Sequence, residues 1–537
     1  MKEKRKERKY WCIISSVFAA LVLIATLVGI YNVLKPLPSG ISYEGEVHNL
    51  SLEDVEFLYD LTYKNASGSK KVEQEIFSRI FELIDNAKRI IIIDAFLFND
   101  DYVGNDSLIQ ITKSLRDKLI AKKHNSPNIT IIFITDEINN FYGSYTSSEI
   151  KELEAGNISV IVTDMIPLRD SNPFYSGFWR TYIRWFGTEG IGSLKHPLGN
   201  QENNVTLRAF LKLLNTKANH RKVLIADMEN SVDCVIPHSN PQELPVLDGL
   251  RNQRFLQSPD REFGTKTDSI NQILCNNSSL VTLVTSANPH EASSFHSNIA
   301  FVVKRKIWQD AFASEEAVAI LSGAQFPNTF LSDFKEENKN PKEEPLTAQL
   351  LTEGKIKRAL LRDLDSMTAG ESIDLAMFYL SDRQVIKALK DASARGVNLR
   401  IILDPNKDAF SREKNGIPNR QVGFELTKAS VSVRWYDTHG EQFHTKLIIL
   451  HKKNRTIVYG GSANYTRRNL DDLNLESVIR ITSVPTSEFA SRVDSYFSRI
   501  WENKDGNYTL DFPAYKDTSK FKVLLYRFQE FSGFSSF

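Results

Sequence analysis

Two short motifs in this chain place a histidine two residues before a lysine, directly ahead of an apolar run. The first pair is His220 and Lys222, and the second is His444 and Lys446. Residues two apart lie on the same face of a β-strand, so each motif presents an imidazole beside an ammonium. An imidazole can attack phosphorus or transfer protons, and an ammonium balances the charge that grows on phosphate oxygens. Each pair therefore combines a group for nucleophilic or acid–base chemistry with a positive charge.

Each pair is followed by a second expected strand that ends in a small polar loop. The first loop contains Ser286 and Asn288, and the second contains Ser462 and Asn464. Hydroxyls, amides and exposed backbone N–H groups suit phosphate oxygens. Either motif alone is common on protein surfaces, but both occur twice and in the same order. We therefore predict that these four residues bind the substrate phosphate.

The elements that must position these motifs also occur twice. Each copy begins with an amphipathic helix and a short buried strand, and then continues with another helix and two more strands. These elements are expected at 72–86, 89–98, 107–122, 129–135 and 158–162, and again at 356–367, 373–381, 383–395, 399–403 and 431–435. In both copies the fourth element closes on an aspartate, Asp136 or Asp404. Alternating strands and helices predict a parallel sheet in an α/β architecture.

The N-terminus has the pattern of a membrane anchor. Residues 1–9 hold six basic and two acidic side chains, and residues 10–34 carry no charge. Such a stretch spans a hydrocarbon layer of about 30 Å at ~1.5 Å per residue. A cleaved signal peptide is the alternative, but its apolar core is usually ~7–15 residues and ends at a small-residue cleavage site. The basic flank predicts a cytoplasmic N-terminus, with the remainder of the chain outside the cytoplasm.

Composition limits the remaining choices. The 537 residues include 67 Lys and Arg, 66 Asp and Glu, and three cysteines, for a net charge of +1. This balance gives no chain-wide attraction to nucleic acid, and the cysteine count excludes a disulfide framework. One disulfide between Cys234 and Cys275 is possible, and two unpaired thiols are the alternative. The expected order is a cytoplasmic basic tail (1–9), a transmembrane anchor (10–34), a stalk (35–53), a first domain (54–332), a charged linker (333–345) and a second domain (346–537).

The repeated His-x-Lys pattern, followed by Ser-x-Asn, resembles the phospholipase D superfamily, also called the HKD family. The resemblance implies two similar α/β domains packed with pseudo-two-fold symmetry, so that one histidine–lysine pair from each meets in a single site. It favours His220 as the nucleophile that forms a phosphohistidine and His444 as the acid and base. Lys222 and Lys446 would balance the phosphate charge, so neither a metal nor another cofactor is expected.

The two copies depart from the family pattern in different ways. Asp227 completes the first motif and is grouped with the catalytic residues, although the family aspartate is usually structural. His451 stands at the equivalent place in the second motif. Glu476 resembles the family's acidic residue that orients a histidine, whereas the first copy has Asn298 there. The first copy also has Thr285 where the second has glycine.

The resulting hypothesis is a membrane-anchored phosphodiester hydrolase or phosphatidyltransferase that acts on phospholipid. Water as acceptor would give hydrolysis, and a lipid hydroxyl would give transfer. One alternative is a phosphodiesterase or exonuclease for single-stranded nucleic acid; another is a catalytically weakened scaffold of the same fold. The aromatic and arginine-rich segment 169–186 either rests at a bilayer interface or extends the first half as a buried insertion. The sequence gives no prediction of oligomeric state.

Overall fold

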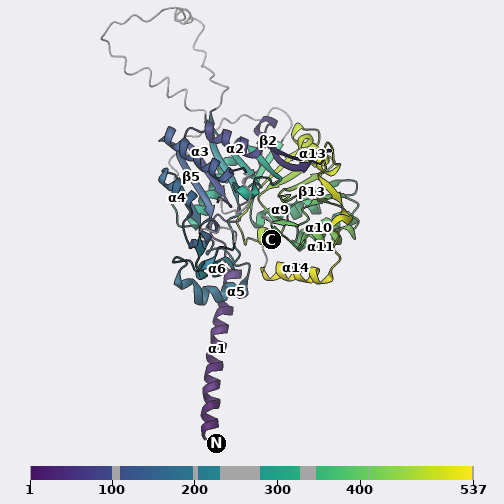
Figure 1. Ribbon diagram of the computed structural model, residues 1–537. Helices are drawn as coiled ribbons and strands as arrows, with labels where there is room; N and C mark the ends of the chain where they lie inside the picture. Colours follow the sequence, from purple (N-terminus) through teal and green to yellow (C-terminus); the bar gives the residue numbers. More distant parts are fainter. Residues whose placement is uncertain are drawn as a thin grey trace, which may run out of the picture.

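The computed structural model describes residues 2–99, 109–197, 203–229, 278–326, 346–409 and 412–534. Within these ranges the chain forms a long N-terminal helix, α1 (Lys2–Leu34), and a mixed α/β body built on two large β-sheets (Figure 1). The predicted α/β class and the single long apolar helix at the N-terminus are confirmed. The expected linker at 333–345 and both Cys234 and Cys275 lie outside the described residues.

The first sheet has eight strands in the order β3-β2-β11-β10-β9-β4-β5-β6. Strands β4, β5 and β6 are parallel, and all other neighbours are antiparallel. The strands are β2 (Val55–Lys64), β3 (Lys70–Gln74), β4 (Ile90–Ala95), β5 (Thr130–Asp136), β6 (Ser159–Thr163), β9 (Lys222–Glu229), β10 (Ser278–Thr285) and β11 (Asn298–Val303). The helices nearest this sheet are α2 (Ile76–Asn86), α3 (Ile111–Asn125), α4 (Ser148–Ala155) and α8 (Ile307–Leu321).

The second sheet has nine strands in the order β1-β12-β20-β19-β18-β13-β14-β17-β21. They are β1 (His48–Leu50), β12 (Leu346–Thr352), β13 (Ser372–Met377), β14 (Asn398–Leu403), β17 (Ser432–Tyr436), β18 (Lys446–His451), β19 (Thr456–Gly461), β20 (Ser477–Ser483) and β21 (Thr509–Asp511). The helices of this half are α9 (Gly354–Asp365), α10 (Arg383–Ala394), α11 (Asn419–Thr427), α13 (Glu488–Trp501) and α14 (Lys520–Ser532).

The strand orders of the two sheets match from β2 to β6 and from β12 to β17, with the same directions. The prediction of a parallel sheet holds only for β4-β5-β6 and β13-β14-β17 and is wrong for the rest of each sheet, because the strand that carries each lysine runs antiparallel to its neighbours. The reason is the connection. β18 and β19 are joined by residues 452–455, and so short a link permits only antiparallel pairing, whereas parallel strands need a crossover.

Helix α2, the first helix of the repeated unit, begins later than the start at residue 72 that its apolar pattern predicts. Val72 lies in β3, which pairs with the end of β2, and α2 starts only at Ile76. The carboxylate of Asp60 accepts hydrogen bonds from the backbone N–H groups of Glu75 (2.8 Å) and Ile76 (3.1 Å). Acceptors of this kind satisfy the unpaired N–H groups at a helix start, so Asp60 fixes where α2 begins.

Three apolar cores give the body its layers. Ile90 and Ile92 of β4 point into a core shared by both sheets, whereas Ile91 and Ile93 point toward α2 and α3. Strand β18 shows the same alternation, with Ile449 in the shared core. Strands buried on both faces read as continuous apolar runs. The layers are therefore helix, sheet, sheet, helix, and Figure 1 shows α3 and α4 on one flank of the body and α10 and α11 on the other.

The segment expected to be a stalk is packed on the body instead. Strand β1 pairs with β12, and both Ile41 and Leu50 are buried. Among the described helices, α1 is the one long and apolar enough to cross a membrane: its most apolar stretch has a mean hydropathy of 2.6 and is almost entirely exposed. This supports the prediction of a membrane helix by length and composition.

At Gly460 on β19 the two sheets lie close together. A Cβ there would lie 2.4 Å from Cε2 of Phe301 and 2.6 Å from Cδ1 of Ile299, both on β11. We expect Gly460→Ala to lower the stability by about 1–3 kcal/mol, because the buried rings must move apart. Thermal unfolding of the detergent-solubilised chain, followed by circular dichroism, measures the effect.

Gly68→Ala is the matched control for this prediction. Gly68 has a φ of +81° but no atom within 4 Å of an added Cβ, so it tests backbone strain without a clash. We expect it to cost no more than about 1 kcal/mol. Equal melting temperatures for the two variants would mean that the sheets tolerate separation at β19.

Candidate active site

The two histidine–lysine pairs occupy equivalent places in the two sheets. Strand β9 begins at Lys222 and strand β18 at Lys446, and each histidine lies two residues earlier. The Nζ of Lys222 donates to the backbone oxygen of His220 at 2.8 Å, and the Nζ of Lys446 donates to that of His444 at the same distance. Each lysine thus folds back on its own histidine, as the spacing of two predicts.

The backbone next to each histidine pairs with the opposite half of the chain. Asn219 forms a parallel bridge with Leu475, and Phe443 forms one with Ser297. The His220 N–H donates to the Leu475 carbonyl at 2.9 Å. The residue that follows each bridge partner therefore lands beside a histidine, although the sequence separates the two by more than a hundred residues.

Those following residues are Glu476 and Asn298. Oε1 of Glu476 lies 2.8 Å from Nδ1 of His220, and Oδ1 of Asn298 lies 3.1 Å from Nδ1 of His444. An ionised carboxylate and an amide oxygen only accept hydrogen bonds. His444 therefore carries its proton on Nδ1, which leaves Nε2 with the lone pair, and the close contact with an ionised carboxylate favours the same form of His220. Glu476 is placed as the resemblance implied, and Asn298 is its counterpart.

The two serines hold these partner side chains rather than standing free for a substrate. Ser286 Oγ donates to Oδ1 of Asn298 at 2.9 Å and accepts from the Ile299 N–H at 3.0 Å. Ser462 Oγ donates to Glu476 and accepts from the Ser477 N–H. Because protein groups occupy both hydroxyls, the predicted phosphate contact of Ser286 and Ser462 is not what this structure shows. Both act on the histidines through their orienting partners.

The two asparagines of the same loops are placed differently. Asn288 and Asn464 are both buried, and the Oδ1 atom of each has no hydrogen-bond partner within the described part of the chain. Unsatisfied buried polar groups are uncommon and call for an explanation. An amide oxygen only accepts hydrogen bonds, so a donor such as a ligand hydroxyl or a water completes these bonds, whereas the predicted phosphate contacts would use the Nδ2 groups of the two amides.

Two phenylalanines that sequence reasoning missed cover the histidines. The Phe96 ring centre lies 4.7 Å from that of His220 and 5.1 Å from Nζ of Lys222. Phe378 stands in the same relation to the second pair, at 4.9 Å from His444 and 5.1 Å from Lys446. Both residues directly follow the first strand of the repeated unit, β4 or β13. Their equivalent places in the two copies were the available signal.

Two buried aspartates fix the approach to each histidine. Oδ2 of Asp136 accepts from the Asn219 N–H at 2.6 Å, and Oδ2 of Asp404 accepts from the Phe443 N–H at 2.8 Å. Burial raises the pKa of Asp136 to about 8 and that of Asp404 to about 7. These are the aspartates that close the matching strands of the repeat, so the repeat had already pointed to them without giving their role.

Asp227 does not belong to the site, and the prediction of a catalytic role is wrong. It lies five residues along β9 from Lys222, about 17 Å away at the rise of a β-strand. There its carboxylate accepts from the backbone N–H groups of Lys88 (3.0 Å), Arg89 (2.9 Å) and Ile90 (2.8 Å) at the start of β4. It ties two strands together at the end remote from the histidines.

His451 takes the equivalent place in the second half and makes a different contact. Its Nε2 lies 3.0 Å from Oδ2 of Asp374 on the neighbouring strand β13. Burial alone would lower the pKa of His451, but the bond to Asp374 outweighs it and raises that pKa. The departure from the family pattern at this position therefore leaves the histidine–lysine pairs untouched.

A buried ion pair that the sequence did not predict joins the halves beside the site. Arg221, which lies between His220 and Lys222, is fully buried. It contacts Glu353 at 2.7 Å and Glu315 at 3.3 Å. Oε1 of Glu353 also accepts from the Glu476 N–H at 3.0 Å. This network fixes the backbone on both sides of the contact between His220 and Glu476.

Burial changes the charge of all four basic groups. Desolvation lowers the pKa of His220 to about 4 and that of Lys222 to about 7. The pKa values of His444 and Lys446 lie well below their ordinary values, mainly through burial and then through repulsion from basic groups of both pairs. His220 and His444 are only 9% and 5% exposed. Because groups of each pair affect the pKa of groups in the other, the structure brings both pairs into one enclosed site.

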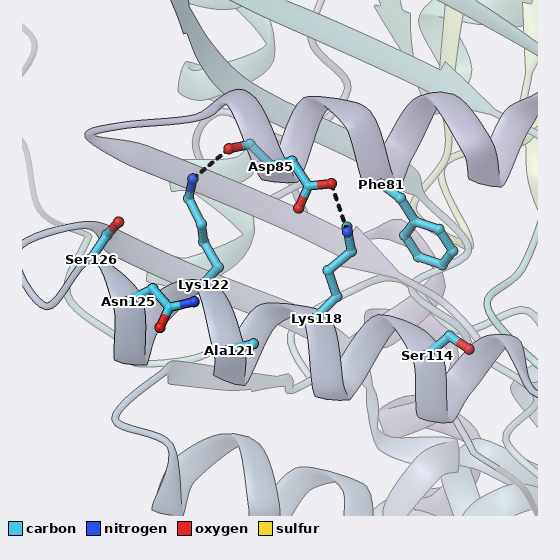
Figure 2. Close-up of a pocket in the computed structure, with 8 residues that line it drawn as sticks. All are labelled: Phe81, Asp85, Ser114, Lys118, Ala121, Lys122, Asn125 and Ser126. Carbon is cyan, nitrogen blue, oxygen red and sulfur yellow. Dashed lines mark hydrogen bonds and ion pairs between the residues drawn. The ribbon is translucent and has the colours of Figure 1, made fainter.

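Two other features bear on the location of chemistry. Within the described ranges, no group of three or more His, Cys, Asp or Glu side chains is arranged to hold a metal ion. A surface groove lies between α2 and α3, where Lys118 pairs with Asp85 at 2.7 Å (Figure 2). This groove shares no residue with the site described above.

Comparisons with known proteins agree with this geometry. A family model described as cardiolipin synthase, PLD-like domain, matches residues 361–501. The chain is 35% identical over 142 residues to a phospholipase D of Rickettsia bellii and 30% identical over 146 residues to the mitochondrial cardiolipin hydrolase of Mus musculus. These matches cover 26% and 27% of this chain and 60% and 58% of the relatives. The chain therefore spans about three fifths of the curated relatives it matches.

One solved structure is similar in fold to nearly the whole of this chain. The crystal structure of phosphatidylserine synthase from Haemophilus influenzae Rd KW20 matches with a TM-score of 0.52 at 11% identity. It covers 95% of this chain and 98% of its own. At that identity the likeness concerns the fold alone. It includes both sheets, whereas the family model matches only the second.

Oxyanion binding should be accompanied by proton uptake. In the free protein the pKa of Lys222 is about 7, so much of this side chain is neutral at pH 8. A bound anion favours the ammonium and raises that pKa. We expect tungstate to bind at pH 8 with uptake of up to about one proton, measured by calorimetry in buffers of different ionisation enthalpy.

Lys222→Arg is the control for this experiment. Its guanidinium stays charged at pH 8, so uptake should fall while tungstate still binds. Binding without uptake in the unmodified chain, or with equal uptake in both proteins, would contradict the assigned charge state of Lys222.

Proposed function

Because this chain belongs to the phospholipase D superfamily, we propose that it hydrolyses or transfers a phospholipid phosphodiester through a phosphohistidine intermediate. The observation that carries the proposal is the unequal pair of histidine contacts, Glu476 on His220 and Asn298 on His444. A shared site with two lysines, one imidazole beside a carboxylate and one beside an amide suits a displacement in two steps. The relatives' names and the two lysines of the enclosed site both favour a phosphodiester.

His220 is the proposed nucleophile. When Nε2 of His220 bonds to phosphorus, the imidazole becomes cationic, and the carboxylate beside Nδ1 stabilises that charge. Burial alone would raise the pKa of Glu476, but the interaction with His220 keeps it below its ordinary value, so the carboxylate is ionised. The pKa of His220 near 4 leaves its Nε2 lone pair available at neutral pH.

His444 is the proposed acid and base. Its partner Asn298 is neutral, so a protonated His444 lacks the stabilisation that Glu476 gives His220 and releases its proton readily. A bound phosphodiester anion favours the imidazolium form of His444, which carries protons on both ring nitrogens. As the P–O bond to the leaving alcohol breaks, Nε2 of this imidazolium gives its proton to that oxygen and the ring becomes neutral. The same nitrogen then takes a proton from water or from an acceptor hydroxyl. The acceptor oxygen bonds to phosphorus, and the P–N bond to His220 breaks.

Lys222 and Lys446 balance the charge of the two nonbridging oxygens in each step. Asn288 and Asn464 bring two buried amides, and we propose that their Nδ2 groups donate to the substrate phosphate. No step calls for a metal or another cofactor. We expect hydrolysis when water is the acceptor and phosphatidyl transfer when a lipid hydroxyl replaces it.

The two halves are proposed to be two domains, 54–332 and 346–537, related by a pseudo-two-fold axis through the site. Matching strand orders and the reciprocal bridges at Asn219 and Phe443 support this relation. We further propose that α1 crosses a membrane with its basic end in the cytoplasm, which puts both domains on the extracytoplasmic side. The basic residues at 2–9 support this orientation.

Release of head group from phospholipid vesicles by the full-length chain tests the substrate class. We expect release that persists in EDTA, because two lysines balance the phosphate charge. His220→Ala should abolish release. Cleavage of a short single-stranded oligonucleotide but not of phospholipid would replace this proposal with the nucleic-acid alternative. No reaction with either substrate would favour the scaffold, and loss of activity in EDTA would contradict the metal-free site.

Label transfer tests the two histidine roles. His444→Asn should let a substrate with a good leaving group phosphorylate His220, because such a group needs little protonation, while breakdown of the intermediate slows. Acid-labile, base-stable label should therefore accumulate on His220. Adding Glu476→Gln should slow its formation by about 10²-fold or more, as when an orienting carboxylate is lost.

Asn298→Gln provides the comparison for Glu476→Gln, because it alters the partner of the other histidine without removing a charge. With His444 replaced by Asn, it should change the rate of labelling far less. Label on His444 in a His220→Ala chain would reverse the proposed roles.

A further inference from the structure

Helix α14 (Lys520–Ser532) exposes an apolar face along its whole length. Four large side chains recur at spacings of three, four and three, which is one face of a helix. They are Phe521 (72% exposed), Leu524 (68%), Phe528 (57%) and Phe531 (75%). Tyr526 and Glu530 point the opposite way and are buried. The helix therefore packs on the body by one side and presents a second, unpartnered apolar side.

A second exposed apolar surface lies beside α1. Residues 173–186 form three consecutive helical turns, α5 (Pro173–Phe178), η3 (Trp179–Ile183) and η4 (Arg184–Phe186). Phe174, Phe178, Trp185 and Phe186 in this segment are exposed, whereas Trp179 and Arg180 are buried. The two alternatives for this segment are thus both partly right: one side is a buried extension and the other is open.

The segment runs alongside the apolar part of α1. The Tyr182 hydroxyl donates to the Leu21 carbonyl at 2.5 Å, and a Cβ on Gly177 would lie 2.3 Å from the Ala25 carbonyl. Leu21 is 13 residues before the end of α1 at Leu34, about 20 Å along the helix axis. A membrane that surrounds α1 therefore also surrounds residues 173–186.

Helix α14 meets this segment at the end of the body from which α1 emerges (Figure 1). A Cβ on Gly533 would lie 2.1 Å from the Ser171 carbonyl, two residues before α5. The exposed cations Lys520 and Arg527 border the apolar face of α14. An apolar stripe edged by cations suits the boundary between lipid tails and anionic head groups.

The same helix is tied to the site. Glu530 accepts from Ser381 Oγ at 2.8 Å and from the Arg467 N–H at 2.7 Å. Ser381 lies three residues beyond Phe378, which covers His444, and Arg467 lies three residues beyond Asn464. The loops that line the site thus end on the inner side of α14.

We propose that the body rests on the bilayer that holds α1, with residues 173–186 inserted beside the anchor and α14 lying in the head-group layer. The site then takes its phosphodiester from that same bilayer. The placement of the substrate rests on the proposed function, whereas the docking of the body does not. The lipid bilayer is chosen as the partner because α1 emerges between these two surfaces.

Fluorescence of the full-length chain in phosphatidylcholine–phosphatidylglycerol vesicles tests the docking. Single cysteines replace Phe178, Phe528 or Lys113 in a chain whose three natural cysteines are serine, and each is labelled with an environment-sensitive dye. Lys113 lies exposed on α3, at the opposite end of the body in Figure 1. Spin-labelled lipids should quench the dye at 178 and 528 but not at 113. Quenching at 528 no greater than at 113 overturns the proposal.

An activity ratio tests the source of the substrate. Leu524→Ser with Phe528→Ser should lower turnover of phospholipid in vesicles by about tenfold and leave turnover of a monomeric short-chain phospholipid unchanged. Ile320→Ser removes an equally exposed apolar side chain from α8 and should change neither. An unchanged ratio in the α14 variant overturns delivery from the bilayer. Absence of turnover with both substrates contradicts the proposed function, and the quenching result then still decides the docking.

Discussion

The reciprocal backbone pairing between the two sheets is the constraint on which the site depends. Asn219 bridges to Leu475 and Phe443 bridges to Ser297, so each histidine receives its Nδ1 partner from the other half. A half-chain alone would keep its histidine and lysine but lose the group that fixes the imidazole. The buried contacts of Arg221 with Glu353 and the close approach at Gly460 hold the same interface. The contacts that stabilise the interface between the halves are therefore the same contacts that position the two histidines.

Enclosure then sets the character of the site. Four basic side chains lie away from water, and burial shifts each toward its neutral form. Buried charges without partners are costly, so in the free protein these groups lose protons. A bound phosphate supplies a negative charge that stabilises their protonated forms. Glu476, the ionised carboxylate that contacts His220 at 2.8 Å, breaks the equivalence of the two copies because its counterpart on His444 is the amide of Asn298. A duplicated fold with nearly equivalent halves thus acquires two different imidazoles from a single exchange of carboxylate for amide.

The sequence predicted what repeats locally and missed what arises between the halves. Both histidine–lysine pairs and the order of helices and strands along each repeated unit followed from motifs and periodicity, and Glu476 followed from the family resemblance. The contact of Asn298 with His444 did not, because neighbours in the chain carry no information about a partner 146 residues away. The predicted phosphate contact of the serines differs from the observed one for a related reason. The sequence does not show that each hydroxyl has a protein partner, Asn298 or Glu476. Asp227 was misplaced because a motif records order along a strand and not distance from its end.

The replacement of a stalk by packed strands changes how the site relates to a membrane. A flexible stalk would let the body move away from the bilayer and meet substrates in solution. Here the Asp170 N–H donates to the Asn32 carbonyl at 3.1 Å, and Arg169 donates to the Lys35 carbonyl at 2.9 Å. Strand β1 adds its edge to the second sheet immediately afterwards. These contacts hold the body rigidly against the end of α1, so a membrane around α1 also sets the height and tilt of the site. Under the proposed docking, a lipid head group reaches the body by lateral diffusion within that bilayer.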